Sequence, residues 1–229
     1  MDKAICNRKS GAEPITVRNC GLMAYREALE LQLEFCEKRH EGLRGNTVLI
    51  VEHPDVITLG ARKSENKLLV DCESLGKRGI DVVEVRRGGG CTAHNPGQLV
   101  VYPIVKLKSL GLGVNEYIRG LEAIGIELLR GYGVSSDRRK GYPGLWVGEE
   151  KIASIGVQVK KGVTIHGMAI NICNDLSIFD NIVPCGIDGV RITSLREQTG
   201  GDVSMDEVKR KIAGIIIKCF SSEEVGGYE

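Results

Sequence analysis

The sequence contains no apolar run long enough to cross a membrane and no recognisable secretory signal. A membrane helix needs about 18 or more mostly apolar residues, and the leading segment MDKAICNRKSGAEP lacks the apolar core of a signal peptide. The formal net charge is only +1 over 229 residues, which gives no overall argument for binding nucleic acid or a membrane surface. We therefore expect a cytoplasmic protein whose partners include neither nucleic acid nor a membrane.

The cysteines also lack the patterns that would indicate a metal site. The eight cysteines are widely scattered, with no C-x-x-C pair and no zinc-like spacing. In a reducing compartment most of them should be thiols, and a single cysteine is usually a small buried apolar residue. The sequence therefore predicts no bound metal.

The chain has the length of one large domain, with no linker, repeat or low-complexity segment inside it. We expect a single domain over residues 14–220. Residues 1–13 and 221–229 are predicted to be flexible ends.

Three amphipathic helices are predicted. The first covers residues 22–38, where Leu22, Tyr25, Leu29, Leu33 and Cys36 follow steps of three and four. The second covers residues 114–130 and is ended by glycines. The third starts at Ser204, with Glu207 completing a capping box.

Strands are predicted in hairpins and blocks between these helices. The last three form a meander joined by Gly-Glu-Glu and Lys-Lys-Gly turns. This pattern indicates an α+β (mixed α/β) fold, with a mixed and largely antiparallel sheet flanked by helices, rather than a doubly wound parallel sheet. The predicted strands cover residues 47–52, 56–60, 81–87, 99–104, 144–147, 151–159 and 163–172.

A triple glycine follows the predicted strand at 81–87. Three consecutive glycines let backbone N–H groups approach a ligand closely, and His94 and Gln98 add polar groups nearby. The loop lacks the lysine of a phosphate loop and the spacing of a dinucleotide fingerprint. Taken alone, the glycines fit a plain tight turn equally well, and His94 fits a structural role.

Lys151 and Cys185 have the most suggestive local contexts. Lys151 enters a strand of small and apolar residues, where a solvated lysine beside a turn would be the ordinary interpretation. Cys185 lies in the Pro-Cys-Gly segment 184–186, a loop with special backbone geometry. A free thiol with a pKa of about 8.5 is mostly protonated at neutral pH, and a neighbouring ammonium would increase the thiolate. The two residues are candidates for a nucleophile and its activating partner.

The strand at 163–172 carries small residues, Gly167 and Ala169, that would leave room for an acyl chain. A core strand with a satisfied His166 explains the same residues equally well.

Together these segments resemble the lipoyl(octanoyl) transferases, the octanoyl-[acyl-carrier-protein]:protein N-octanoyltransferases of lipoate synthesis. The resemblance runs from about Val48 to Leu195. It is carried by EHPDVITLG, RRGGGCTAHNPGQLVVYPI, PGLWVGEEKIASIGVQV, VTIHGMAINI and DLSIFDNIVPCGI.

The resemblance implies the catalytic fold of biotin and lipoate ligases and a role for each matching residue. Cys185 matches the acyl-thioester nucleophile, and Lys151 matches the lysine that lowers the pKa of that thiol. The segments implied to line the acyl pocket, and so to bind substrate, are Arg87, Gly88, Gly89, Gly90, Cys91, Thr92, Ala93 and His94, then Ser154, Ile155 and Gly156, and then Gly167, Met168 and Ala169.

The chain departs from the family pattern before Pro96. The family usually has Thr-Tyr-His-Gly where this sequence has Thr92-Ala93-His94-Asn95. We expect Ala93 to remove an aromatic wall from the acyl pocket without touching a catalytic group.

The implied reaction moves an octanoyl group from octanoyl-acyl carrier protein, through a thioester on Cys185, to a lysine of a lipoyl domain or of the glycine-cleavage H protein. It needs no cofactor and no ATP, because a thioester is exchanged for a thioester and then for an amide. The basic cluster Arg138, Arg139 and Lys140 either docks the acidic carrier protein or forms a solvated loop.

Three alternatives remain from the sequence. One is an ATP-dependent lipoate or biotin ligase of the same fold, and another is an enzyme that moves octanoyl between two lipoyl-domain proteins. The third is a carrier-protein binding module without activity.

Overall fold

The structure is a computed structural model that describes residues 13–187 and 189–220, with the backbone alone at Cys185. Its centre is a sheet in the order β1-β2-β6-β10-β9-β8-β7. The sheet is mainly antiparallel, although β1 runs parallel to β2, and β11 (Arg191–Ile192) pairs in parallel with β9. These strands are β1 (Ile15–Leu22), β2 (Asn46–Glu52), β6 (Gln98–Ile104), β10 (Val163–Asn171), β9 (Glu150–Lys160), β8 (Tyr142–Val147) and β7 (Asp137–Arg139).

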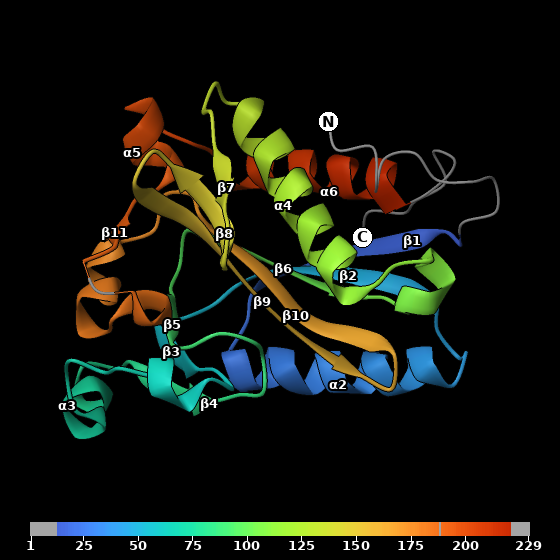
Figure 1. Cartoon of the computed structure of the whole chain (residues 1–229), viewed down its shortest axis with the longest axis horizontal. Helices are drawn as coiled ribbons and strands as arrows, with labels where there is room; N and C mark the ends of the chain where they lie inside the picture. The colour runs from blue at the N-terminus through green and yellow to red at the C-terminus, as the bar shows by residue number, and fades with distance from the viewer. Residues whose placement is uncertain (1–12, 188, 221–229) are drawn as a thin grey trace.

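Helices cover both faces of this sheet (Figure 1). One face carries α4 (Val114–Arg130) and α6 (Met205–Phe220), whose apolar residues share a core with Val48, Leu99 and Met168. The other face carries α2 (Tyr25–His40), which packs on a second cluster that includes Leu49 and Ala169. The predicted α+β class, with a largely antiparallel sheet flanked by helices, is confirmed.

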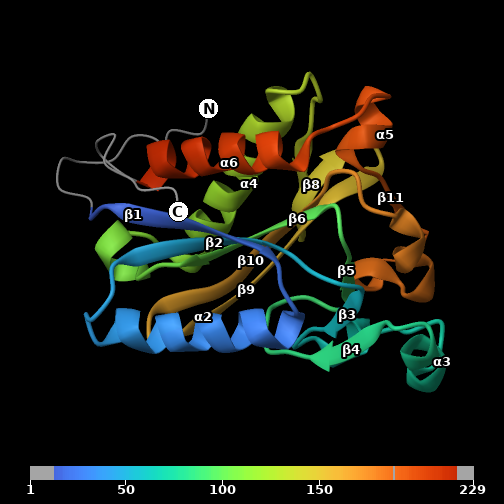
Figure 2. The same ribbon diagram turned by 180° about the vertical axis from the view of Figure 1, so that it is seen from behind.

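A smaller sheet lies beyond the N-terminal end of α2, as the reverse view in Figure 2 also shows. It has the order β4-β3-β5 and is covered by α3 (Cys72–Lys77). Its strands are β3 (Val56–Leu59), β4 (Asp81–Glu84) and β5 (Thr92–His94). The shortest helix, α5 (Leu195–Thr199), follows β11.

The predicted meander is confirmed, because β8 pairs with β9 and β9 pairs with β10, both antiparallel. Helix α4 has the predicted bounds. Helix α6 begins beside the predicted cap, where Ser204 Oγ accepts a hydrogen bond from Glu207 N at 3.4 Å.

Two expectations about the elements were wrong. The first helix begins at Tyr25 rather than Leu22, because residues 15–22 form β1 and Leu22 is 61% exposed. The strand predicted at 81–87 ends at Glu84, because the chain turns toward the triple glycine. The strands β2 and β3 belong to different sheets, so the segment His53–Asp55 leads from one sheet to the other.

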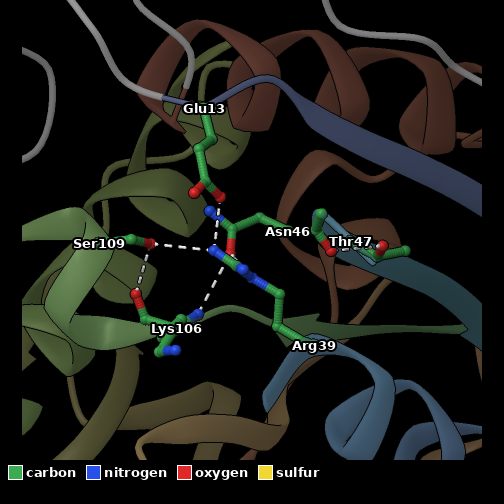
Figure 3. Close-up of polar contacts among 7 residues, drawn as sticks. Glu13, Arg39, Asn46, Thr47, Lys106 and Ser109 are labelled. Carbon is green, nitrogen blue, oxygen red and sulfur yellow. Dashed lines mark hydrogen bonds and ion pairs between the residues drawn. The ribbon is translucent and has the colours of Figure 1, made fainter. Parts of the chain in front are cut away.

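The C-terminal end of α2 is fixed by a buried arginine, as Figure 3 shows. Arg39 Nε donates to Asn46 Oδ1 at 2.8 Å, and its guanidinium also pairs with Glu13 and donates to Ser109 Oγ. Lys106 N donates to the same Asn46 oxygen. Residues 1–12 and 221–229, most of the predicted flexible ends, lie outside the described residues.

Candidate active site

Lys151 is buried at the start of β9, with only 2% of its surface exposed. Its ammonium lies 5.4 Å from the centre of the Trp146 ring on β8, within reach of a cation–π interaction. The Lys151 carbonyl accepts a hydrogen bond from Thr193 N at 3.0 Å. The side chain is therefore held in the protein interior, which excludes the solvated-lysine interpretation.

A buried carboxylate lies beside Gly144, the residue of β8 that approaches this lysine. Glu122 on α4 is 1% exposed, pairs with Arg138 at 3.1 Å and accepts a long hydrogen bond from Gly144 N at 3.4 Å. A Cβ on Gly144 would lie 2.3 Å from Ala153 O and 3.0 Å from Lys151 Cε. Only a glycine at position 144 therefore lets β8 pass this close to β9 and to the Lys151 side chain.

The backbone of Cys185 lies in a single turn of 3-10 helix, Pro184–Gly186. The loop is attached on both sides to segments near the site. Before it, Val183 N donates to Lys67 O at 2.9 Å, and after it, Ile192 of β11 pairs with Lys151. The side chain of Cys185 lies outside the described atoms, so its contact with Lys151 stays a prediction.

A narrow cavity, of about 40 Å³, lies between the glycine loop and the strands β9 and β10. The pairing of Ser154 with Ala169, and of Gly156 with Gly167, aligns two of the predicted segments along one stretch of the sheet. Gly88 N donates to Val157 O at 2.9 Å, which joins the third segment to them. The lining consists of Tyr25, Arg87, Gly88, Gly89, Thr92, His94, Val100, Tyr102, Ser154, Ile155, Gly156, His166, Gly167, Met168 and Ala169.

Three of the predicted pocket residues are not in this lining. Cys91 and Ala93 are fully buried in a separate apolar cluster beneath the small sheet. In β5 the side chains alternate, so Thr92 and His94 face the cavity while Ala93 faces away from it. The third residue, Gly90, packs against Glu65. The departure from the family pattern at Ala93 therefore changes the cluster rather than the cavity wall.

The guanidinium of Arg87 shapes the glycine loop. It is 7% exposed and donates to Gly90 O at 2.8 Å and to Thr58 O at 2.8 Å. The position of the loop also requires a glycine on β9, because a Cβ on Gly156 would lie 2.8 Å from Gly88 O.

Two buried histidines, His94 and His166, line the cavity, and a third, His53, contacts Tyr102 of the cavity wall; all three are neutral. Burial lowers the pKa of His53 to about 4. Burial, aided by the charge of Arg87, lowers the pKa of His166 to about 3. Burial, and next the neighbouring His53, lowers the pKa of His94 well below its usual value. These cavity walls therefore carry no histidine charge at neutral pH.

The hydrogen bonds of two histidines fix their tautomers. His53 Nδ1 must donate to Met23 O at 2.8 Å, so its Nε2 accepts from the Tyr102 hydroxyl at 2.8 Å. Gln98 uses its amide nitrogen toward Asn171 Oδ1, so its oxygen accepts from His94 Nδ1 at 2.7 Å.

A second cavity, of about 270 Å³, is lined in part by Lys151 and adjoins the first. The two share Gly88, Gly89, Ile155 and Gly156 in their linings. The predicted pocket residues did not include Tyr25, Val100, Tyr102 and His166, which also line the first cavity. The spacing of the first three carries no signal, because α2 and β6 reach the cavity only through the tertiary fold.

Glu65 lies where the two loops of the site meet. It lines the second cavity and pairs with Arg62 at 2.9 Å. A Cβ on Gly90 would lie 2.4 Å from Glu65 Cβ, and a Cβ on Gly186 would lie 2.9 Å from the same atom. Both glycines therefore make room for one side chain.

Two of the three basic residues at 138–140 are engaged within the fold. Arg138 pairs with Glu122, and Arg139 stacks 4.0 Å from the Trp146 ring centre and pairs with Glu149. This favours a structural role for these two side chains.

Within residues 13–187 and 189–220, no group of three or more His, Cys, Asp or Glu side chains is arranged to hold a metal ion. No helix in that part of the chain is long and apolar enough to span a membrane.

Comparison with solved structures shows the same fold in lipoate ligases. Plasmodium falciparum LipL1 in complex with lipoate superimposes with a TM-score of 0.73 at 14% identity, covering 93% of this chain and 66% of that one. A lipoate-protein ligase A bound with ATP gives 0.70 at 14% identity, over 95% and 87% of the two chains. At these identities the similarity establishes the fold alone.

Curated relatives are much closer in sequence. An octanoyltransferase of Roseiflexus sp. (strain RS-1) is 43% identical over 212 residues, covering 91% of this chain and 88% of the relative. An octanoyltransferase of Alkaliphilus metalliredigens is 38% identical over 208 residues, covering 90% and 95%. The model of the lipoyl protein ligase A/B catalytic domain matches residues 24–216. The chain thus belongs to the lipoyl protein ligase A/B catalytic-domain family, as a relative of its octanoyltransferases.

Proposed function

We propose that this protein is an octanoyltransferase of lipoate biosynthesis that works through a Cys185 thioester, with octanoyl-acyl carrier protein as donor. The acceptor is a lysine of a lipoyl domain or of the glycine-cleavage H protein. The observation that carries the proposal is the narrow cavity beside the buried Lys151, lined by three sequence segments that are distant along the chain. We propose that the reaction takes place in the cytoplasm.

In the first step the Cys185 thiolate attacks the thioester carbonyl of the donor. The new carbon–sulfur bond forms as the carrier's phosphopantetheine thiolate leaves and takes up a proton. Lys151 stabilises the Cys185 thiolate and gives that proton. Backbone N–H groups of the loops stabilise the oxyanion.

In the second step the neutral ε-amine of the acceptor lysine attacks the acyl-enzyme. The amide bond forms, the Cys185 sulfur leaves, and the proton lost from the amine returns through Lys151 to the thiol. The products are an octanoyl-lysine and the free enzyme, so no ATP, metal or other cofactor is consumed.

Intact mass spectrometry tests the acyl-enzyme directly. After incubation with octanoyl-carrier protein without ATP, the wild-type mass should increase by one octanoyl group. The Cys185→Ser variant should neither retain a hydroxylamine-sensitive acyl group nor support transfer. Transfer by Cys185→Ser at the wild-type rate would exclude this mechanism.

The rival function is an ATP-dependent lipoate ligase, because a lipoate-protein ligase A bound with ATP has the same fold. A ligase would convert free octanoate or lipoate to an adenylate and would not need Cys185. Transfer from the free acid that appears only with ATP, and no transfer from octanoyl-carrier protein, would establish the rival.

Arg138 and Arg139 are already paired within the fold, so we do not expect them to bind the carrier protein. Reversing the exposed charge at Lys140 is the remaining test of that loop. If Lys140→Glu leaves the apparent donor affinity and its salt dependence unchanged, the loop has no docking role.

A further inference from the structure

His166 has a backbone conformation that non-glycine residues rarely adopt. Its φ is +59°, and in the described part of the chain Lys161, with φ +51°, is the one other non-glycine residue with a positive value. Lys161 lies in the exposed turn between β9 and β10, where such a conformation is common. His166 lies inside β10 and is buried, so its conformation is imposed by the surrounding structure.

A hydrogen bond and a close approach of β10 to β6 hold this conformation. Gln32 on α2 is fully buried, and its Oε1 accepts a hydrogen bond from His166 N at 2.7 Å. At the next residue, a Cβ on Gly167 would lie 2.2 Å from Val101 O. Strand β10 accordingly pairs with β6 only from Met168 onward.

The positive φ of His166 interrupts the alternation of side chains along β10. Ile165 packs in the apolar cluster under α2, and the following His166 ring lies on that same side, beside Tyr25 and Tyr102. The Tyr25 hydroxyl is 3.5 Å from His166 Nδ1. A regular strand would have sent consecutive side chains to opposite faces.

Tyr25, Tyr102 and His166 line the first cavity, and none of them lines the second cavity, which Lys151 lines. We propose that the Tyr25–His166 pair is the chain-length stop, which blocks the acyl chain after the octanoyl length. The inference rests on the proposed function, because it needs the carbonyl end to lie toward Lys151. The Tyr25 ring from α2 and the His166 ring from β10 form a wall that is fixed from two elements.

The test compares acyl chains of different length on variants that remove this wall. Glycine tolerates a positive φ, so His166→Gly removes the ring without straining the backbone. Tyr25→Leu opens the wall from α2 and keeps an apolar side chain at the start of the helix. For each variant the rate of thioester formation is measured with octanoyl-, decanoyl- and dodecanoyl-carrier protein.

Both variants should raise the ratio of decanoyl to octanoyl kcat/KM, by about tenfold when two further methylenes are buried. Lys161→Gly is the matched control, because it places glycine at the other positive φ of the same hairpin without touching the cavity. Its ratio should equal that of the wild type.

The outcomes separate the two proposals. Wild-type protein that forms no octanoyl thioester would refute the proposed function. Wild-type protein that forms it, with an unchanged chain-length ratio in folded His166→Gly, would refute the stop. If His166→Gly does not fold by circular dichroism, the ratio of Tyr25→Leu decides in the same way.

Discussion

Lys151 illustrates at the residue scale how a costly side chain indicates function. Lysine is almost never fully buried in proteins, because its ammonium loses its hydration. Here the fold places it under Trp146 and against Gly144, at the edge of a cavity. An apolar side chain would be buried here at a lower free-energy cost, and this supports the proposal that the charge of Lys151 is used.

The substitution Lys151→Met separates these two roles. Methionine has a similar shape without the charge, so the free energy of unfolding should stay constant or increase. Octanoyl transfer should fall by about 10²–10⁴-fold, the usual contribution of a proton-transfer group. Urea unfolding and a transfer assay measure the two effects, and a Lys151→Met protein with wild-type transfer would remove Lys151 from the mechanism.

Gly156 is a residue at which a close backbone approach shapes the cavity. A methyl group there would meet Gly88 O at 2.8 Å, and that atom belongs to the backbone of the glycine loop. We expect Gly156→Ala to lower the free energy of unfolding by about 1–3 kcal/mol and to reduce acyl-enzyme formation.

The control for this prediction is Gly214→Ala on α6, where an added Cβ meets nothing within 4 Å. That change should stabilise the protein by about 0.5–1 kcal/mol, since alanine is the better helix former. Chemical denaturation of both variants checks the contrast. Equal effects would mean that the glycine loop moves freely to accommodate a side chain.

At the scale of elements, the last helix is joined to the turn that precedes β6. Lys209 on α6 pairs with Glu52 Oε1 at 2.7 Å, and Gly97 N donates to Glu52 Oε2 at 2.8 Å. Lys209 has 6% of its side chain exposed and Glu52 has 17%. One carboxylate therefore connects α6, the end of β2 and the segment that carries His94.

Removing one partner of this pair should leave an unpaired charge. Lys209→Met is expected to lower the free energy of unfolding by about 3 kcal/mol. Adding Glu52→Gln removes the remaining charge and retains an acceptor for Gly97 N, so the double variant should recover most of the loss. Denaturant midpoints of the two single variants and the double variant measure this coupling, and strictly additive losses would contradict it.

An element with a clear local sequence pattern, such as α4, was predicted correctly. Helix α4 repeats its apolar residues at helical spacing and ends at Gly131, so its bounds were read directly. The buried face of α2 was only partly predicted. It includes Gln32 and Arg39, whose burial depends on partners in β10 and β2 that lie far along the chain.

The candidate site divides in the same way. The glycine loop and the segments around Ser154 and Met168 carry motifs, and they line the cavity. The positive φ of His166 and the approach of Tyr25 arise from tertiary packing, which no local pattern encodes. The alternation of β5 likewise turns Ala93 away from the cavity, although it lies inside a motif.

For the whole molecule, the buried histidines make stability depend on pH. The folded pKa values of His53, His94 and His166 all lie below the usual 6.5. Above pH 6.5 these residues are neutral in both the folded and the unfolded chain, so their contribution is fully present. Below it the unfolded chain binds the additional protons, and stability is lost as the pH falls toward 4 and 3.

Urea unfolding between pH 8 and pH 4.5 should show this loss. Each of the three histidines contributes a slope of up to about 1.4 kcal/mol per pH unit below 6.5. His166→Gly has one buried histidine fewer, so its slope in this range should be shallower by about a third. An unchanged slope would mean that His166 is protonated in the folded protein.

The shared contact of Gly90 and Gly186 with Glu65 has a consequence for the evolution of this chain. The glycine loop and the cysteine loop are separated by almost a hundred residues, yet neither can gain a side chain while Glu65 keeps its position. Positions 65, 90 and 186 should therefore be inherited as a set. In lineages where one of the two glycines has been replaced, a smaller residue at position 65 should accompany the replacement.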